Sequence, residues 1–125
     1  MAQKKILVVD DDKEWNLLLK IRLQASGYQV AQAFNGKEAL EKIEQDQPDM
    51  ILLDITMPVL SGWDVCRVLR EQPKTKDMPI LIHSSYNRPE DIEQGKFYQV
   101  KRFLIKPCLP GTVVQNVQDV FNSQG

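Results

Sequence analysis

Five polar side chains stand out because each lies at the carboxyl end of an apolar run. Asp10 and Asp11 follow the first run, and Asp54 follows the next strongly apolar one. Ser84 and Lys106 end two later runs. Carboxylates that lie close together repel one another, so they must take up protons or bind a cation. A set of oxygen ligands without a thiol suits Mg²⁺ in particular.

Asp54 is the candidate reactive centre. It follows the four apolar residues Met50–Leu53, so we expect it to sit at the end of a rigid, buried strand. A carboxylate can act as a nucleophile and become an acyl phosphate. A lysine beside a metal ion and a hydroxyl typically neutralises a phosphoryl group during its transfer. The residues alone therefore predict Mg²⁺-assisted phosphoryl transfer to Asp54.

Short apolar runs bounded by turn residues predict strands that are buried on both faces. One segment is less apolar than the others, and we expect it nearer an edge of the sheet. The predicted strands are 6–9, 29–33 (the less apolar one), 50–53, 79–85 and 102–105. The predicted helices are 12–26, 36–45, 62–71, 89–98 and a last one from about residue 110.

Residue types that favour helix starts and helix ends mark the limits of these helices. Gly27 is a typical residue just after a helix end. Asp12, Asn35 and Ser61 are residue types that cap helix starts, and they precede the first three helices. Pro110 is favoured in the first turn of a helix. The boundaries therefore agree with the apolar pattern.

Strand and helix alternate five times along the chain. This order predicts an α/β fold with a parallel sheet, right-handed crossovers and helices on both faces. The carboxyl ends of parallel strands meet at one edge, where ligands bind in open α/β sheets. We therefore expect the three acids, Ser84 and Lys106 to gather at one rim despite their separation in sequence.

Composition limits the possible function classes. The chain has 125 residues, enough for one domain with a sizeable core. Its net charge is −1 with acids and bases mixed, so nothing suggests direct nucleic-acid binding. The apolar runs are too short for a membrane span or a signal peptide. Cys66 and Cys108 have no metal-binding spacing, and we expect two reduced thiols in a cytoplasmic protein.

Four pieces of the sequence, in order and each at a predicted strand end, resemble the receiver domains of response regulators, which are CheY-like. The pieces are Ile6–Asp11, Asp54–Pro58 followed by Gly62, Ile82–Ser85 and Phe103–Pro107. The resemblance covers essentially the whole chain. It implies one receiver domain over residues 1–125 with no output domain. It also implies a flavodoxin-like doubly wound (βα)5 fold with sheet order 2-1-3-4-5.

The resemblance also implies roles for the acids. Asp54 is then the phosphoacceptor, which takes a phosphoryl group from a histidine kinase or a histidine phosphotransfer protein. Asp10 and Asp11 hold Mg²⁺, and Asp54 and the backbone carbonyl of Thr56 complete the protein ligands. The phosphoryl group then switches a surface that binds an output protein or a fused domain, which the sequence does not identify.

Further implied roles concern the rest of the rim. Ser84 hydrogen-bonds the phosphoryl group and draws its loop inward, and Lys106 pairs with the phosphoryl oxygens. Phe103 falls at the switch aromatic, which rotates between outward and inward positions. The Lys106–Pro107 peptide is expected to be cis. Tyr86 and Thr56 flank the path of the attacking water, and we hypothesise that the bulk of Tyr86 slows dephosphorylation.

The chain departs from the family pattern at three places. Ser84 stands where threonine is usual, and it keeps the hydroxyl. Phe103 stands where tyrosine is common, and it lacks the hydroxyl's hydrogen bond. Gln99 and Val100 stand where a Gly-Ala pair often precedes the last strand. This departure affects the expected local shape of the fourth helix and its exit, and with it the output surface.

Three other function classes share parts of this pattern. A phosphatase of the haloacid dehalogenase type needs a second aspartate two residues after Asp54, where this chain has Thr56. A flavodoxin-like cofactor binder needs a phosphate loop after the first strand, where this chain has acids. A phosphorylation-independent docking module stays open as the alternative, although the complete set of acids, hydroxyl and lysine counts against it. The chain is either a stand-alone regulator or part of a larger protein such as a hybrid kinase.

Several other residues have structural explanations. His83 neighbours Ser84, so its side chain points to the opposite face of the strand, and we expect a structural role. Trp15, Leu18 and Leu19 share one expected face of the first helix. Two interpretations, a partner surface or core packing with solvated charges, stay open for a group near the last strand: Lys96, Phe97, Tyr98, Lys101 and Arg102.

Overall fold

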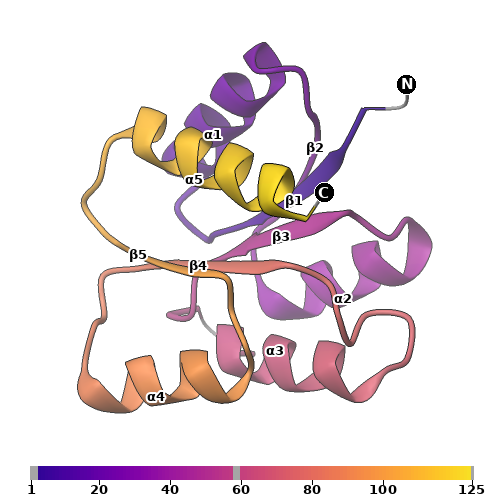
Figure 1. Cartoon of the computed structure of the whole chain (residues 1–125), viewed down its shortest axis with the longest axis vertical. Coiled ribbons are helices and arrows are strands. Elements are labelled where there is room, and N and C mark those ends of the chain that lie inside the picture. Colours follow the sequence, from indigo (N-terminus) through magenta and orange to yellow (C-terminus); the bar gives the residue numbers. More distant parts are fainter. Residues whose placement is uncertain (1–2, 58–59, 125) are drawn as a thin grey trace.

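A five-stranded parallel sheet forms the centre of the molecule (Figure 1). The computed structural model describes residues 3–57 and 60–124, so Pro58 of the resemblance lies outside the described residues. The strand order is β2-β1-β3-β4-β5, which confirms the expected order. The strands are β1 (Lys5–Val9), β2 (Gln29–Ala33), β3 (Met50–Leu53), β4 (Ile80–Ser84) and β5 (Arg102–Ile105).

Helices cover both faces of the sheet (Figure 1). Alternate residues of each central strand enter two separate cores, as the twofold repeat of a strand requires. Leu7, Ile51 and their neighbours pack under α2, α3 and α4, whereas Ile6 and Leu52 pack under α1 and α5. The helices are α1 (Lys13–Ala25), α2 (Gly36–Gln45), α3 (Gly62–Glu71), α4 (Pro89–Phe97) and α5 (Pro110–Ser123).

The predicted helix caps are confirmed. Asp12 accepts a hydrogen bond from the N–H of Trp15, three residues into the first turn of α1. Asn35 caps α2 in the same way. Ser61 and Asp64 form a reciprocal capping box at the start of α3. Local sequence therefore sets where each of these helices begins.

Helix α1 differs from the expected apolar face. Leu18, expected on one face with Trp15 and Leu19, is 38% exposed, whereas Leu19 is buried. Asn16 is instead fully buried, together with Leu19 and Leu23. The amide of Asn16 is buried because backbone carbonyl groups at the ends of β1 and β2 accept its hydrogen bonds. The buried face of α1 therefore includes a polar residue, whose burial depends on partners in two strands.

The exit of α4 has an unusual backbone. Gln99, which stands where the resemblance described above implies a glycine, adopts a φ of 58°. A side chain at this left-handed φ is strained, and glycine avoids that strain. Helix α4 itself packs closely through Gly95, where an added Cβ would lie 3.4 Å from the ring of Phe103. Phe97, at the end of the helix, is 76% exposed.

None of the helices in the described part of the chain has both the length and the apolar character that crossing a bilayer requires.

Candidate functional site

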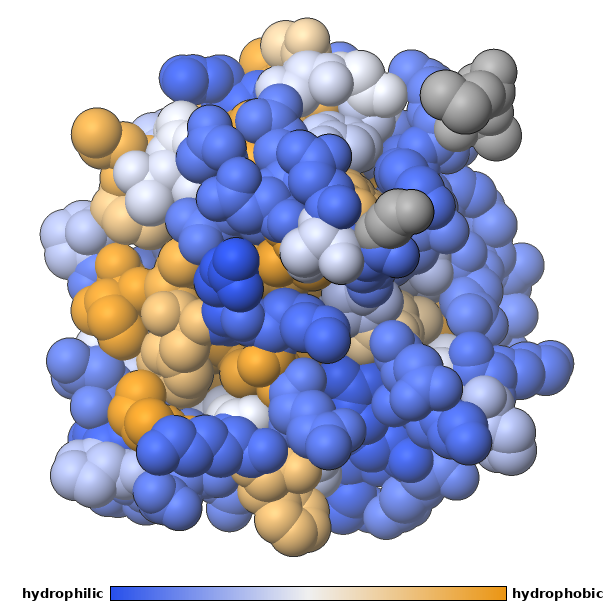
Figure 2. Space-filling view, in the orientation of Figure 1, coloured by the Kyte–Doolittle hydropathy of each residue, from blue (hydrophilic) through white to orange (hydrophobic). Residues whose placement is uncertain are grey.

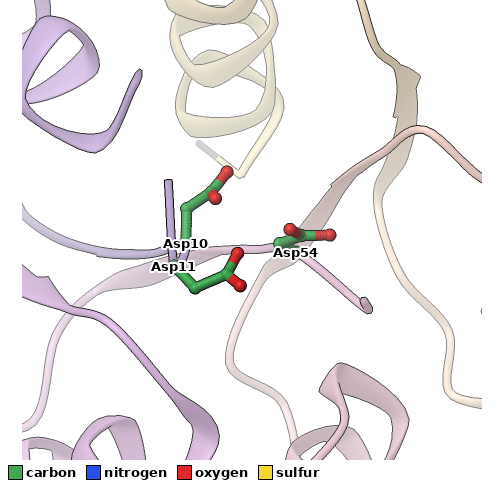
Figure 3. Close-up of side chains that lie close together, drawn as sticks. All are labelled: Asp10, Asp11 and Asp54. Carbon is green, nitrogen blue, oxygen red and sulfur yellow. The ribbon is translucent and has the colours of Figure 1, made fainter. Parts of the chain in front are cut away.

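The parallel register brings the acidic residues together. Val9 of β1 pairs with Leu53 of β3, so Asp10 and Asp54 directly follow neighbouring positions on adjacent strands. One carboxylate oxygen from each of Asp10, Asp11 and Asp54 lies within 4.8 Å of the others. Figure 3 shows the three side chains at the ends of these two strands. The predicted gathering of the acids at one rim is therefore confirmed.

Backbone groups hold two of these carboxylates. Asp10 is 2% exposed, and its Oδ1 accepts a hydrogen bond from the N–H of Asp12 at 2.9 Å. Asp54 is 6% exposed, and its Oδ1 accepts one from the N–H of Thr56 at 3.0 Å. Asp11 is exposed. Two buried carboxylates with fixed orientation and one solvent-facing carboxylate therefore surround one point of the rim.

Lys106, which directly follows β5, joins this cluster. Ser84 of β4 pairs with Ile105 of β5, and the N–H of Lys106 donates to the carbonyl of Ser84 at 2.8 Å. Its Nζ donates to Oδ2 of Asp10 at 2.6 Å and lies 3.5 Å from Oδ2 of Asp54. The Lys106–Pro107 peptide is cis, as expected. One ammonium group therefore bridges two buried carboxylates.

The protonation equilibria reflect this crowding. Burial raises the pKa of Asp10 and of Asp54 above the usual aspartate value, although hydrogen bonds to each carboxylate act in the opposite direction. Burial lowers the pKa of Lys106, but its hydrogen bond to Asp10 and the carboxylate charges outweigh burial and raise it. The site therefore holds more negative charge than one lysine balances, and a cation would be stabilised there.

The donor set fits Mg²⁺. The clustered groups are carboxylates, which are hard oxygen ligands, and the nearby cysteine and histidine are engaged with each other instead. Mg²⁺ typically uses few protein carboxylates and keeps several waters. A rim with one exposed and two buried carboxylates suits that preference.

Ser84 is buried at the same edge, but its hydroxyl faces its own loop. Its Oγ accepts a hydrogen bond from the N–H of Tyr86 at 3.0 Å. Tyr86 is partly exposed, and the guanidinium of Arg88 lies over its ring at 4.8 Å from the centroid. The sequence carries no signal for this contact of Arg88, because an arginine in a polar loop resembles any solvated residue.

Arg88 begins a chain of contacts that leads away from the rim. Its guanidinium donates to both carboxylate oxygens of Asp91, at 2.8 and 3.2 Å. The indole N–H of Trp63 donates to Asp91 at 3.5 Å. The rings of Trp63 and Phe103 lie 6.4 Å apart. The expected switch aromatic is thus half-buried against α3 and α4, and is joined to the Tyr86 loop by these contacts.

His83 is structural, as predicted. It is buried, and its Nδ1 accepts a hydrogen bond from the indole N–H of Trp15 at 3.0 Å. An indole N–H can only donate, so the neutral ring carries its proton on Nε2, which lies 3.4 Å from Sγ of Cys108. Burial, together with the charge of Lys106, lowers the pKa of His83 to about 4. A neutral histidine therefore links α1, β4 and the loop that follows Lys106.

Comparison with known proteins agrees with this geometry. The family model for the response regulator receiver domain matches residues 6–118. The chain is 38% identical over 117 residues to the alkaline phosphatase synthesis transcriptional regulatory protein PhoP of Bacillus subtilis, covering 94% of this chain and 48% of that protein. It is 35% identical to an uncharacterized 14.6 kDa protein of Leptolyngbya boryana, covering 94% and 90%.

Solved structures give the same result. The chemotaxis protein CheY4 of Vibrio cholerae has a TM-score of 0.89 with this chain at 34% identity, covering 95% of this chain and 99% of that one. The chain spans about half the length of several of the curated relatives that it matches. From the family match, the sheet order and the acidic rim together, we conclude that the chain belongs to the response regulator receiver domain family of two-component signalling.

Proposed function

We propose that this receiver domain is a switch that accepts a phosphoryl group on Asp54 with the help of Mg²⁺. The observation that carries the proposal is the convergence of Asp10, Asp11 and Asp54 within 4.8 Å, with Lys106 bridging two of them. These three aspartates, with the backbone carbonyl of Thr56, would hold the ion. When bound, the ion supplies positive charge to the phosphoryl oxygens during transfer.

Asp54 is the proposed nucleophile because its orientation is set in advance. The N–H of Thr56 holds Oδ1 of Asp54, while Oδ2 lies toward Lys106. A carboxylate oxygen attacks phosphorus, the phosphorus–nitrogen bond of the donor phosphohistidine breaks, and the imidazole leaves with that electron pair. Lys106 then exchanges part of its pairing with Asp10 for the new phosphoryl oxygens. The transfer is to the chain's own side chain, so we propose no turnover of an external substrate.

The switch would follow from the new phosphoryl oxygens. The hydroxyl of Ser84, which accepts from Tyr86 in this structure, would donate to the phosphoryl group and draw its loop inward. The half-buried Phe103 would respond to that movement, and its contact with Trp63 would change. Two conformations of the loop and ring, biased by the phosphoryl group, would change the affinity of the face formed by α4, β5 and α5.

The proposed phosphodonor is a histidine kinase or a histidine phosphotransfer protein, and the setting is the cytoplasm. Apolar side chains reach the surface near the rim, among them Tyr86, Ile105 and Leu109. Figure 2 shows apolar surface gathered on the left, the side of the sheet's carboxyl edge, and mostly hydrophilic surface on the right. We propose that output runs through a separate protein or a fused domain, and that this chain itself contacts neither nucleic acid nor membrane.

Intact mass spectrometry tests the proposal. The native chain, Asp54→Asn and the exposed control Asp119→Asn would be incubated with a small-molecule phosphodonor, with and without Mg²⁺. We expect a Mg²⁺-dependent gain of one phosphoryl group in the native chain and the control, and none in Asp54→Asn. Absence of a gain in the native chain would contradict the proposal and favour the phosphorylation-independent docking module.

A further inference from the structure

A buried amide lies directly beneath the acidic rim. Asn16 projects from the second turn of α1 and is fully buried. Its Nδ2 donates to the carbonyl oxygens of Asp10 and Ala33, each at 3.0 Å, and lies 3.4 Å from that of Val8. Its Oδ1 accepts a hydrogen bond from the side-chain amide of Gln32 at 2.9 Å. The hydrogen bond from Gln32 therefore supports the same orientation of the Asn16 amide that the carbonyl groups require.

These carbonyl groups mark the end of a strand pair. Val9 and Ala33 are the last paired residues of β1 and β2, and the N–H of Asp10 donates to Ala33 at 3.1 Å. Beyond Ala33 the chain leaves the sheet, and Asn35 caps the start of α2. The side-chain amide of Asn16 takes the place of the next backbone donor, so the carbonyl of Asp10 stays paired although its strand partner has ended.

As a result, four hydrogen bonds fix the backbone and the carboxylate of Asp10. Its N–H donates to the carbonyl of Ala33, and its carbonyl accepts from the side-chain amide of Asn16. Its carboxylate accepts from the backbone N–H of Asp12 and from Nζ of Lys106. Rotation of the peptide after Asp10 would change the path of the backbone into the adjacent Asp11. The hydrogen bond from Asn16 restrains this peptide from inside the protein.

We propose that Asn16, oriented by Gln32, is a positioning residue that fixes the Asp10–Asp11 turn for cation binding. The inference rests on the proposed function, in which these two aspartates hold Mg²⁺. Groups that hydrogen-bond the residues around a metal preserve the orientation of its ligands, and their loss commonly weakens metal affinity. Asn16 touches neither the ion nor the phosphoryl group in this account, so its effect runs through Asp10.

A matched control separates positioning from general stability. Thr75 is also buried, and its hydroxyl donates to a backbone carbonyl, that of Leu69, at 2.6 Å. It lies in the loop before β4, at the opposite end of the sheet from the acids. Asn16→Leu and Thr75→Val each replace a buried donor by an apolar group of similar size. Both should lower the denaturation midpoint, but only the first should affect the rim.

The experiment measures the dissociation constant of Mg²⁺ by titration calorimetry on the native chain, Asn16→Leu, Gln32→Met and Thr75→Val. We expect about tenfold weaker binding in Asn16→Leu. Gln32→Met should weaken binding less, because the amide of Asn16 remains but loses its orienting partner. Thr75→Val should bind as the native chain does. If Asn16→Leu does not fold, Gln32→Met carries the test.

The outcomes are distinct. Native affinity in a folded Asn16→Leu would overturn the inference, as would native affinity in Gln32→Met if that variant alone folds. Equal weakening in Thr75→Val would also overturn it, because general destabilisation would then explain the loss. Failure of the native chain to bind Mg²⁺ would instead contradict the proposed function, since that result involves no substitution at Asn16 or Gln32.

Discussion

Acidification should destabilise the protein through one buried side chain, His83. The ring is buried, accepts a hydrogen bond from Trp15 and contacts Cys108. Protonation would replace the acceptor lone pair on Nδ1 with a second N–H that faces the indole N–H of Trp15. Burial and the nearby charge of Lys106 accordingly lower the pKa of His83 from 6.5 to about 4. The folded protein therefore resists a proton that the unfolded chain accepts.

The sign and size of the stability change follow from the difference between the folded and unfolded pKa of His83. The contribution of His83 to stability is complete above its unfolded pKa of 6.5, and is lost as the pH falls toward 4. A difference of one pKa unit corresponds to about 1.4 kcal/mol, so the whole loss is about 3 kcal/mol. About 2 kcal/mol of it is lost between pH 7 and pH 5. The raised pKa values of Asp10 and Asp54 act in the opposite direction.

The assay is equilibrium denaturation of the native chain and His83→Leu at several pH values from 7 to 5. His83→Leu costs stability at pH 7, because Trp15 loses its acceptor. The informative quantity is the difference in the free energy of unfolding between the two proteins at each pH. The contributions of the carboxylates are common to both proteins and cancel in this difference. We expect this difference to shrink by about 2 kcal/mol over the range. A difference that does not vary with pH would refute the reasoning.

Three further substitutions test other parts of the structure. Gln99→Gly should raise the free energy of unfolding by about 1 kcal/mol in denaturation experiments, because glycine adopts the left-handed φ of 58° without strain. Tyr86→Ala should shorten the lifetime of the phosphoryl group on Asp54, measured by intact mass over time, because a bulky side chain near the rim is lost. Lys106→Met should lower the free energy of unfolding without Mg²⁺ by about 3 kcal/mol, because two buried carboxylates lose their cation. Added Mg²⁺ should restore most of that loss.

Each of these expectations can fail separately. Gln99→Ala is the control for backbone strain, and equal stability of the alanine and glycine variants would contradict the explanation. Unchanged phosphoryl loss in Tyr86→Ala would remove Tyr86 from the determinants of lifetime. A Lys106→Met variant as stable as the native chain would mean that its ammonium group contributes no net stabilisation to the acidic rim.

Much of the fold and the site was predictable because the signals are local. The apolar runs before Asp10, Asp54 and Lys106 identified strands, and a regular alternation with helices implied parallel strands whose ends meet. The caps Asn35 and Ser61 act within three residues of their own position. The sequence by itself therefore determined the elements, their order and the edge where the chemical groups gather.

Only the tertiary structure decided which buried polar groups face one another. His83 and Trp15 lie 68 residues apart, and the burial of Asn16 depends on where β2 ends. A polar residue has many possible partners along a chain, and packing selects one by leaving a particular donor opposite a particular acceptor.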